Sequence, residues 1–300
     1  MIRQILIKSS KSRLPDGALK TNFGDLLRAA ILFDSLPPET IWMTDSEGKD
    51  LLQWFVHPDR LALFNELENL PLTKKFTVYN LDNYISVDNI FRRRDWKWKG
   101  FLPAENSHLR PQNESIAALQ PYTPFQNGKS FQQNLLEGFG FPWQCQDYPN
   151  CSLEYPISHN IGLNWQVHPQ WKSKQWSLRN WSVLADELQK DCSISWQKGL
   201  NDFGEYLRWI ASCRVIVTQD SLGLHLASAL KKKVVALVGP TESGEYDYGR
   251  VTFIRPEPLE CMPCNSPLCL NGGTCLDNIE PQSLAGIVIQ QAAEDLISVI

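Results

Sequence analysis

Two kinds of apolar pattern alternate along the chain. Short apolar runs such as Arg3–Lys8 and Arg214–Thr218 predict buried strands. Segments such as Gly24–Phe33 and Phe203–Ala211 carry apolar residues three and four positions apart, which predicts helices with one buried face. Strands that alternate with helices are typical of a parallel sheet covered by helices. The pattern therefore predicts an α/β fold.

The remaining elements repeat this alternation in two halves of the chain. The polar segments 9–23 and 112–130 are predicted to be loops, and the proline-containing segment 141–160 a linker. Two Rossmann-like domains facing a cleft are expected, over residues 1–155 and 156–300. Further strands are predicted at 40–43, 76–81, 160–166, 193–196 and 234–238, and further helices at 131–138, 178–189, 222–230 and 282–297.

Composition disfavours several classes of protein. The 300 residues include 29 Lys and Arg against 33 Asp and Glu, so no basic excess indicates a nucleic-acid partner. The apolar runs are shorter than the roughly 20 residues of a membrane helix, and the first residues do not resemble a signal peptide. We therefore expect a cytoplasmic protein whose thiols stay reduced.

The segment with the clearest chemistry follows the strand Arg214–Thr218. Asp220 and Ser221 come at the carboxyl end of this strand, where ligands bind in open α/β sheets. Ser221 is predicted to cap the next helix, whose first N–H groups could bind an anion such as a diphosphate. Gly239-Pro240-Thr241 follows the next strand and is expected at the same edge. The same spacing also fits an ordinary capped βαβ unit, so both interpretations stay open.

This segment resembles the carboxyl-terminal signature of glycosyltransferase family 9, the ADP-heptose heptosyltransferases. That signature has Asp-Ser or Asp-Thr at a strand end, a histidine one turn into the helix, and Gly-Pro-Thr after the next strand. One position differs, because glycine stands at Gly223 rather than at Leu222. The matching residues are Asp220, Ser221, His225, Ala229, Leu230, Gly239, Pro240 and Thr241.

Two other segments extend the resemblance. Lys174-Gln175-Trp176-Ser177 is similar to a family segment in which a lysine ahead of a helix contacts the donor phosphates. A cation beside a helix N-terminus suits an anion on physical grounds as well. Gly24-Asp25 is similar to the family's Gly-Asp at the head of the first helix, where the aspartate is the candidate general base. Residues 9–23 separate it from the first strand, a longer loop than is usual in the family.

The resemblance implies a GT-B fold in which the final helix returns toward the first domain. It implies an inverting transfer of heptose from ADP-L-glycero-D-manno-heptose to a hydroxyl group, with lipopolysaccharide core as the expected acceptor. Asp25 would be the base, and no catalytic metal is expected. Two alternatives stay open: a protein heptosyltransferase of the autotransporter type, and a non-catalytic relative that binds a nucleotide sugar. The implied donor-binding residues are Lys174, Asp220, Ser221, Leu222, Gly223, Leu224, His225 and Thr241.

A basic and aromatic cluster lies at Phe91–Lys99. Its charge suits an anionic glycolipid acceptor, and it also suits peripheral contact with the cytoplasmic face of the inner membrane. A solvated helix end followed by a strand is the plain alternative. The candidate acceptor-binding residues are Arg92, Arg93, Arg94 and Lys97.

Four of the eight cysteines fall close together near the end of the chain. The spacing Cys261-x2-Cys264-x4-Cys269-x5-Cys275, with Gly272-Gly273 between, is typical of a loop that folds around a metal ion. Four sulfur ligands suit a structural Zn²⁺, or alternatively iron. Reduced thiols without a metal are the alternative.

Overall fold

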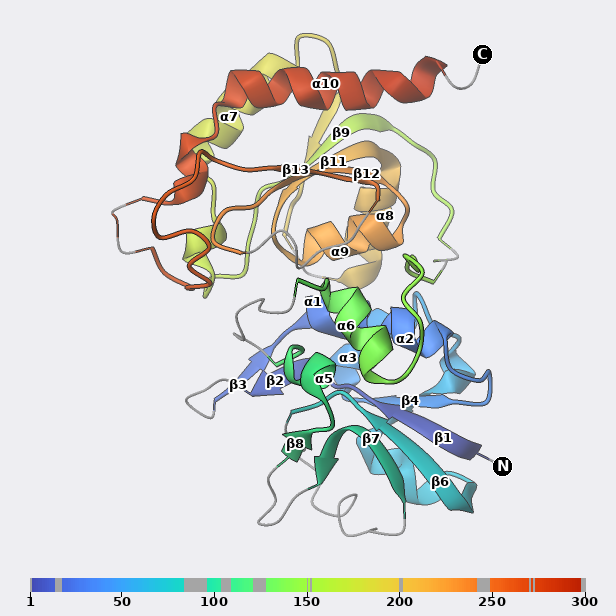
Figure 1. Ribbon diagram of the computed structural model, residues 1–300. Helices are drawn as coiled ribbons and strands as arrows, with labels where there is room; N and C mark the ends of the chain where they lie inside the picture. Colours follow the sequence, from blue (N-terminus) through green and yellow to red (C-terminus); the bar gives the residue numbers. More distant parts are fainter. Residues whose placement is uncertain are drawn as a thin grey trace. The chain divides into compact units, whose positions relative to one another are not determined.

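The computed structural model of the chain describes residues 2–13, 18–83, 96–103, 109–120, 128–149, 151, 153–199, 202–241, 249–269, 271 and 273–297. The chain divides into two compact units, Met1–Pro149 and Asn150–Ile300, and each is described by itself (Figure 1). Within the described ranges, no helix is both long and apolar enough to cross a bilayer.

The first unit is built on a six-stranded sheet. Its order is β5-β4-β1-β6-β7-β8, and its pairs are parallel except for β7 with β8. The buried side chains of Ile5, Ile7, Met43 and Val78 form the core on one face. The strands are β1 (Ile2–Ile7), β4 (Ile41–Thr44), β5 (Leu61–Leu63), β6 (Leu72–Asn80), β7 (Lys97–Pro103) and β8 (Leu109–Pro111).

Helices and short turns complete this unit. They are α1 (Phe23–Arg28), α2 (Ala30–Asp34), α3 (Ser46–Leu52), α5 (Glu114–Ala117), α6 (Phe131–Gly138), and the 3-10 turns η1 (Pro58–Arg60) and η2 (Phe64–Asn69). Periodicity predicted one helix over Gly24–Phe33, but Ala29 ends α1 and begins the separate helix α2. The predicted helix over 131–138 is confirmed as α6.

Two segments predicted to be loops contain regular structure. Residues 9–23 include an antiparallel hairpin of β2 (Lys11–Arg13) and β3 (Leu19–Thr21). Residues 112–130 include α5, which begins where the Asn113 side chain accepts a 2.9 Å hydrogen bond from the N–H of Ile116. Strand pairing and a capping bond stabilise these polar segments, and neither effect leaves an apolar pattern.

The second unit is built on a five-stranded parallel sheet of order β10-β9-β11-β12-β13. Its strands are β9 (His159–Asn164), β10 (Ile194–Trp196), β11 (Cys213–Gln219), β12 (Lys233–Leu237) and β13 (Val251–Ile254). Its helices are α7 (Leu178–Leu188), α8 (Phe203–Ser212), α9 (Leu222–Ala229) and α10 (Pro281–Ile297), with the 3-10 turns η4 (Lys172–Lys174) and η6 (Cys275–Asn278). The elements expected in this half are all present, and β13 is an additional strand.

The sheet of the second unit is covered by helices on both faces. On one face, Val215 and Val217 of β11 pack in a buried cluster with Trp181 of α7 and Val288 of α10. Helices α7 and α10 lie on this face of the sheet, and α8 and α9 lie on the other (Figure 1). Because the strands are parallel, the carboxyl ends of β9, β11 and β12 meet at one edge.

Candidate functional site

The first group of predicted site residues gathers at this carboxyl edge. Asp220 follows β11 directly, and Thr241 follows β12 and donates a 2.7 Å hydrogen bond to Asp220 Oδ2. The ammonium group of Lys174 forms an ion pair with the same oxygen. The Lys174 and Asp220 side chains are only 13% and 4% exposed, so little solvent separates the charges. The structure therefore brings three of the predicted donor-binding residues into direct contact.

The Lys174 segment is held in place by residues that the sequence motifs did not include. The Gln219 side chain accepts a hydrogen bond from the backbone N–H of Trp176 and donates a 2.8 Å bond to the Trp165 carbonyl. The Lys174 ammonium also lies 4.5 Å from the centre of the Trp171 ring. Gln219 stands immediately before Asp220, so its position in the sequence could have marked it as a site residue. Its contacts with Trp176 and Trp165 could not be predicted, because these residues are far from it in sequence.

Ser221 differs from the prediction. It occupies the N-cap position of α9, yet its side chain makes no capping hydrogen bond. Its Oγ instead accepts a 3.1 Å hydrogen bond from Asn164 Nδ2, at the end of β9. The predicted cap is therefore wrong, because a neighbouring strand supplies a partner that local sequence does not reveal. Within α9, Gly223, Leu224 and His225 are buried, and Leu222 is partly buried.

The candidate base Asp25 lies in the first unit, in the first turn of α1. Asn22 donates a side-chain hydrogen bond to Asp25 Oδ2, and Arg28 Nη1 lies 3.4 Å from Oδ1. The Arg28 side chain is only 2% exposed, and its guanidinium lies 4.1 Å from the centre of the Phe131 ring. The carboxylate is thus oriented through both oxygens by residues that the sequence alone did not single out.

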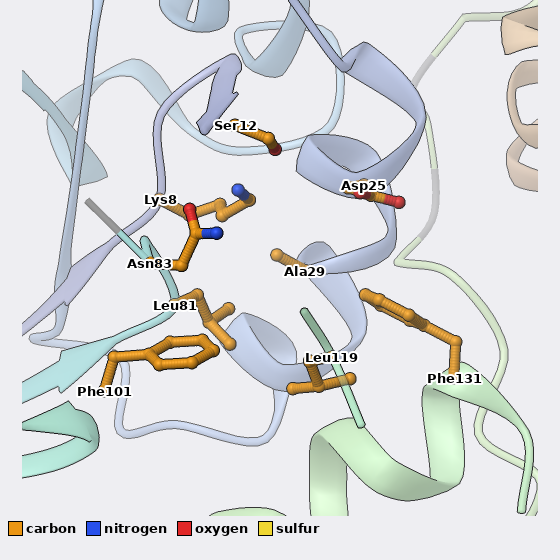
Figure 2. Close-up of a pocket in the computed structure, with 9 residues that line it drawn as sticks. All are labelled: Lys8, Ser12, Asp25, Ala29, Leu81, Asn83, Phe101, Leu119 and Phe131. Carbon is orange, nitrogen blue, oxygen red and sulfur yellow. The ribbon is translucent and has the colours of Figure 1, made fainter. Parts of the chain in front are cut away.

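Asp25 lines a pocket within the first unit. Figure 2 shows the polar side chains of Lys8, Ser12, Asn83 and Asp25 toward one end of it. Apolar side chains complete the lining: Ala29, Leu81, Phe101, Leu119 and Phe131. A carboxylate beside an apolar wall is an arrangement that could receive a sugar hydroxyl and its ring.

Lys8 enters this pocket as part of a buried ion pair. Its ammonium lies 3.1 Å from Asp82 Oδ1, and the backbone N–H of Ser9 donates to both Asp82 oxygens at 3.0 and 3.2 Å. Burial raises the pKa of Asp82, while Lys8 and the Ser9 bonds oppose that effect. The strand-end lysine was visible in the sequence, but its partner follows β6 and comes near only in the folded sheet.

The predicted acceptor cluster is only partly described. Arg92, Arg93 and Arg94 lie outside the described residues. Lys97 is an exposed residue at the start of β7, four residues before the pocket residue Phe101, and does not line the pocket beside Asp25. Acceptor binding by this cluster stays a prediction.

The four clustered cysteines are free thiols. Burial, followed by the nearby thiols of Cys264, Cys269 and Cys261, raises the pKa of Cys275 to about 11. However, nowhere in the described ranges do three or more His, Cys, Asp or Glu residues come together so as to hold an ion. A structural metal at this loop therefore stays a prediction.

The loop that carries the four cysteines makes structural contacts that the spacing of the cysteines did not indicate. It packs on the Lys174 segment: the N–H of Ser173 donates a 3.1 Å bond to the Pro267 carbonyl. Thr274 Oγ1 donates a 2.9 Å bond to the Gln175 carbonyl. Since both bonds flank Lys174, this loop helps to hold the lysine at the sheet edge.

These features define a fold class, the two-domain α/β architecture called GT-B. The E. coli heptosyltransferase WaaC, solved with ADP, matches with a TM-score of 0.63 at 12% identity, over 97% of this chain and 100% of WaaC. The iron-containing dodecameric glycosyltransferase TibC of enterotoxigenic E. coli matches with a TM-score of 0.59 at 16% identity, over 98% of this chain and 77% of TibC. At such identities the likeness shows the fold.

Sequence comparison gives a match in the second unit. The family model of glycosyltransferase family 9 (heptosyltransferase) matches residues 163–274. Lipooligosaccharide heptosyltransferase 2 of Campylobacter jejuni serotype O:2 is 32% identical over 221 residues, which are 72% of this chain and 61% of that relative. The matches span about three fifths of the length of the curated relatives. Residues 163–274, in the second unit, thus match glycosyltransferase family 9.

Proposed function

We propose that the chain transfers heptose from ADP-heptose to a hydroxyl group of lipopolysaccharide core, with inversion at the sugar. The observation that carries this proposal is the contact of Lys174 and Thr241 with Asp220, beside the N-terminus of α9. It lies in the part of the chain that matches the family. The structure of WaaC with ADP supports an adenine nucleotide as the donor.

The donor diphosphate would lie between the Lys174 ammonium and the first turn of α9. An ammonium group has three N–H donors, so Lys174 can keep its bond to Asp220 and still donate to a phosphate oxygen. The N–H groups and dipole of α9, with the Ser221 hydroxyl, add positive potential at the same place. Asp220 would contact sugar hydroxyls, with His225 and Thr241 in supporting roles. This arrangement would stabilise the departing ADP without a catalytic metal.

The acceptor hydroxyl would bind in the pocket that Asp25 lines. Its oxygen attacks the anomeric carbon as the bond from that carbon to the ADP oxygen breaks, and Asp25 takes the hydroxyl proton. The hydrogen bonds from Asn22 and Arg28 would hold the carboxylate in position for this transfer.

We place this reaction in the cytoplasm, with peripheral contact at the inner membrane where the glycolipid acceptor resides. All eight cysteines are free, which suits a reducing compartment. The basic residues Arg92, Arg93, Arg94 and Lys97 are the proposed contacts for an anionic acceptor.

A structural metal at the cysteine loop is a separate proposal. The structurally similar TibC is an iron-containing protein, and in this chain the thiols of Cys264, Cys269 and Cys261 lie near enough to Cys275 to raise its pKa. Elemental analysis after purification in reducing, chelator-free buffer tests it. About one Zn or Fe per chain supports a metal, and a ratio near zero refutes it.

The proposed activity is tested with ADP-heptose and three acceptor preparations: heptose-deficient lipopolysaccharide, an autotransporter passenger protein, and water alone. We expect heptose on the lipopolysaccharide and release of ADP. Transfer to the protein would instead support the autotransporter-type alternative. Binding of ADP-heptose without turnover on any acceptor would contradict an enzymatic role.

A further inference from the structure

Asn164 forms the centre of a buried hydrogen-bond network beneath the start of α9. Tyr206 of α8 donates a 2.6 Å bond to Asn164 Oδ1. Asn164 Nδ2 donates to Thr218 Oγ1 at 2.7 Å and to Ser221 Oγ at 3.1 Å. Asn164 is completely buried. Its hydrogen bonds link β9, α8 and β11 to Ser221, the residue that precedes α9.

The chemistry of the groups sets the direction of each bond in this network. Burial raises the pKa of the Tyr206 phenol, so the phenol keeps its proton and donates to the amide oxygen. The amide nitrogen then faces Thr218 and Ser221 and uses one hydrogen on each. Thr218 donates its own hydrogen to the Gln219 carbonyl at 2.8 Å. Ser221 Oγ is therefore an acceptor toward Asn164. Its own hydrogen has Thr218 Oγ1 at 3.4 Å as the other partner in the network, a long contact that a closer phosphate oxygen could replace.

Glycine at position 223 is what allows this amide to reach Ser221. A Cβ atom at Gly223 would lie 2.1 Å from Asn164 Nδ2 and 2.7 Å from the Tyr206 hydroxyl. No side chain fits at such distances, and both neighbours are buried. The position at which the sequence departs from the family signature thus has to be glycine for Asn164 and Tyr206 to pack there.

We infer that Asn164 is a positioning residue that orients the Ser221 hydroxyl as a hydrogen-bond donor toward the donor diphosphate. This inference rests on the proposed function. A phosphate oxygen only accepts hydrogen bonds, so a serine whose acceptor side is occupied by Asn164 presents the complementary group. Asn164 acts through Ser221 and does not touch the nucleotide.

The test is a double-mutant cycle read by ADP affinity. Asn164→Leu, Ser221→Ala and the double variant are titrated with ADP by calorimetry and with adenosine by NMR. Each single variant should bind ADP about five- to tenfold more weakly, and the double variant should be no weaker than the weaker single variant. Adenosine affinity should not change, because adenosine has no phosphate. A residue that only supports the fold would weaken both ligands.

Three results would overturn the inference. Losses that add up in the double variant would show that Asn164 acts independently of Ser221. Unchanged ADP affinity in Asn164→Leu, with weaker binding in Ser221→Ala, would refute positioning but keep the donor site. Unchanged ADP affinity in Ser221→Ala would also refute the proposed hydrogen bond from the Ser221 hydroxyl to the diphosphate.

A second variant covers the case in which Asn164→Leu does not fold. Tyr206→Phe keeps the ring and removes only the donor to Asn164 Oδ1. It should weaken ADP binding about two- to threefold in the natural background and leave it unchanged in the Ser221→Ala background. An equal loss in both backgrounds would refute the inference.

Discussion

Thr241 donates a hydrogen bond of 2.7 Å to Asp220, across the carboxyl ends of two neighbouring parallel strands. The bonded oxygen is the one that pairs with Lys174. A hydroxyl and an ammonium group on one oxygen fix the carboxylate and the lysine together at the sheet edge. A ligand that binds there meets a lysine already in position, which lowers the entropy lost on binding.

Lys174→Ala should weaken ADP binding about tenfold or more. The variant loses a cation and leaves the Asp220 carboxylate without its lysine partner beside the diphosphate. Calorimetric titration with ADP measures this effect. Lys172→Ala is the matched control, because Lys172 is an exposed lysine of the same turn and should bind ADP normally. Equal affinity in both variants would mean that Lys174 does not hold phosphate.

Asp25→Asn should lower the rate of heptose transfer about 10²- to 10⁴-fold, the usual contribution of a general base. ADP affinity should remain normal, because the proposed donor residues lie in the other unit. The exposed Asp59 provides a control, and Asp59→Asn should transfer at the natural rate. A fully active Asp25→Asn variant would exclude this residue as the base.

Gly223→Ala should destabilise the protein by about 1–3 kcal/mol, as expected for overpacking against Asn164 and Tyr206. The control is Gly286→Ala in α10, where an added Cβ would meet no atom within 4 Å. That variant should be neutral or more stable, by up to about 1 kcal/mol, because alanine favours a helix over glycine. Chemical unfolding measures both. Equal stability of the two variants would contradict the packing described at Gly223.

Stability should depend on Cys213 in alkaline solution. Burial raises the pKa of its thiol from the ordinary 9 to about 11. Between these values the unfolded chain releases the proton and the folded chain keeps it, so the contribution is complete below pH 9 and is lost as the pH rises toward 11. The loss relative to Cys213→Ala should reach about 1–2 kcal/mol.

Urea unfolding of both proteins at about pH 8, 9 and 10.5 measures this difference. Cys275 titrates in both proteins, so the comparison isolates Cys213. Parallel pH profiles for the two proteins would show that Cys213 does not contribute.

The alternation of apolar runs predicted most strands and helices, because the two sheets bury their strands against helices. It predicted the second unit best, where Val215 and Val217 face one layer and α8 and α9 cover the other. It missed the short strands β2, β3, β5, β8 and β13 and the short helix α5, which are stabilised by pairing or capping. It also missed the break at Ala29, since α1 and α2 continue one apolar pattern.

The site was predictable where residues lie at strand ends. Lys174, Asp220 and Thr241 were singled out and come together, although their roles stay predictions. Asn164, Gln219 and Arg28 were not singled out, because each acts through a partner that only folding brings near. Ser221 was singled out, but its local position predicted a capping hydrogen bond to α9. In the structure its side chain instead accepts a hydrogen bond from Asn164 at the end of β9.

A crystal structure of the protein with ADP tests the proposed donor site most directly. We expect the diphosphate within hydrogen-bond distance of Lys174 and of the first turn of α9, with Asp220 beside it. A nucleotide bound elsewhere, with the Lys174–Asp220 pair and α9 untouched, would contradict the proposal.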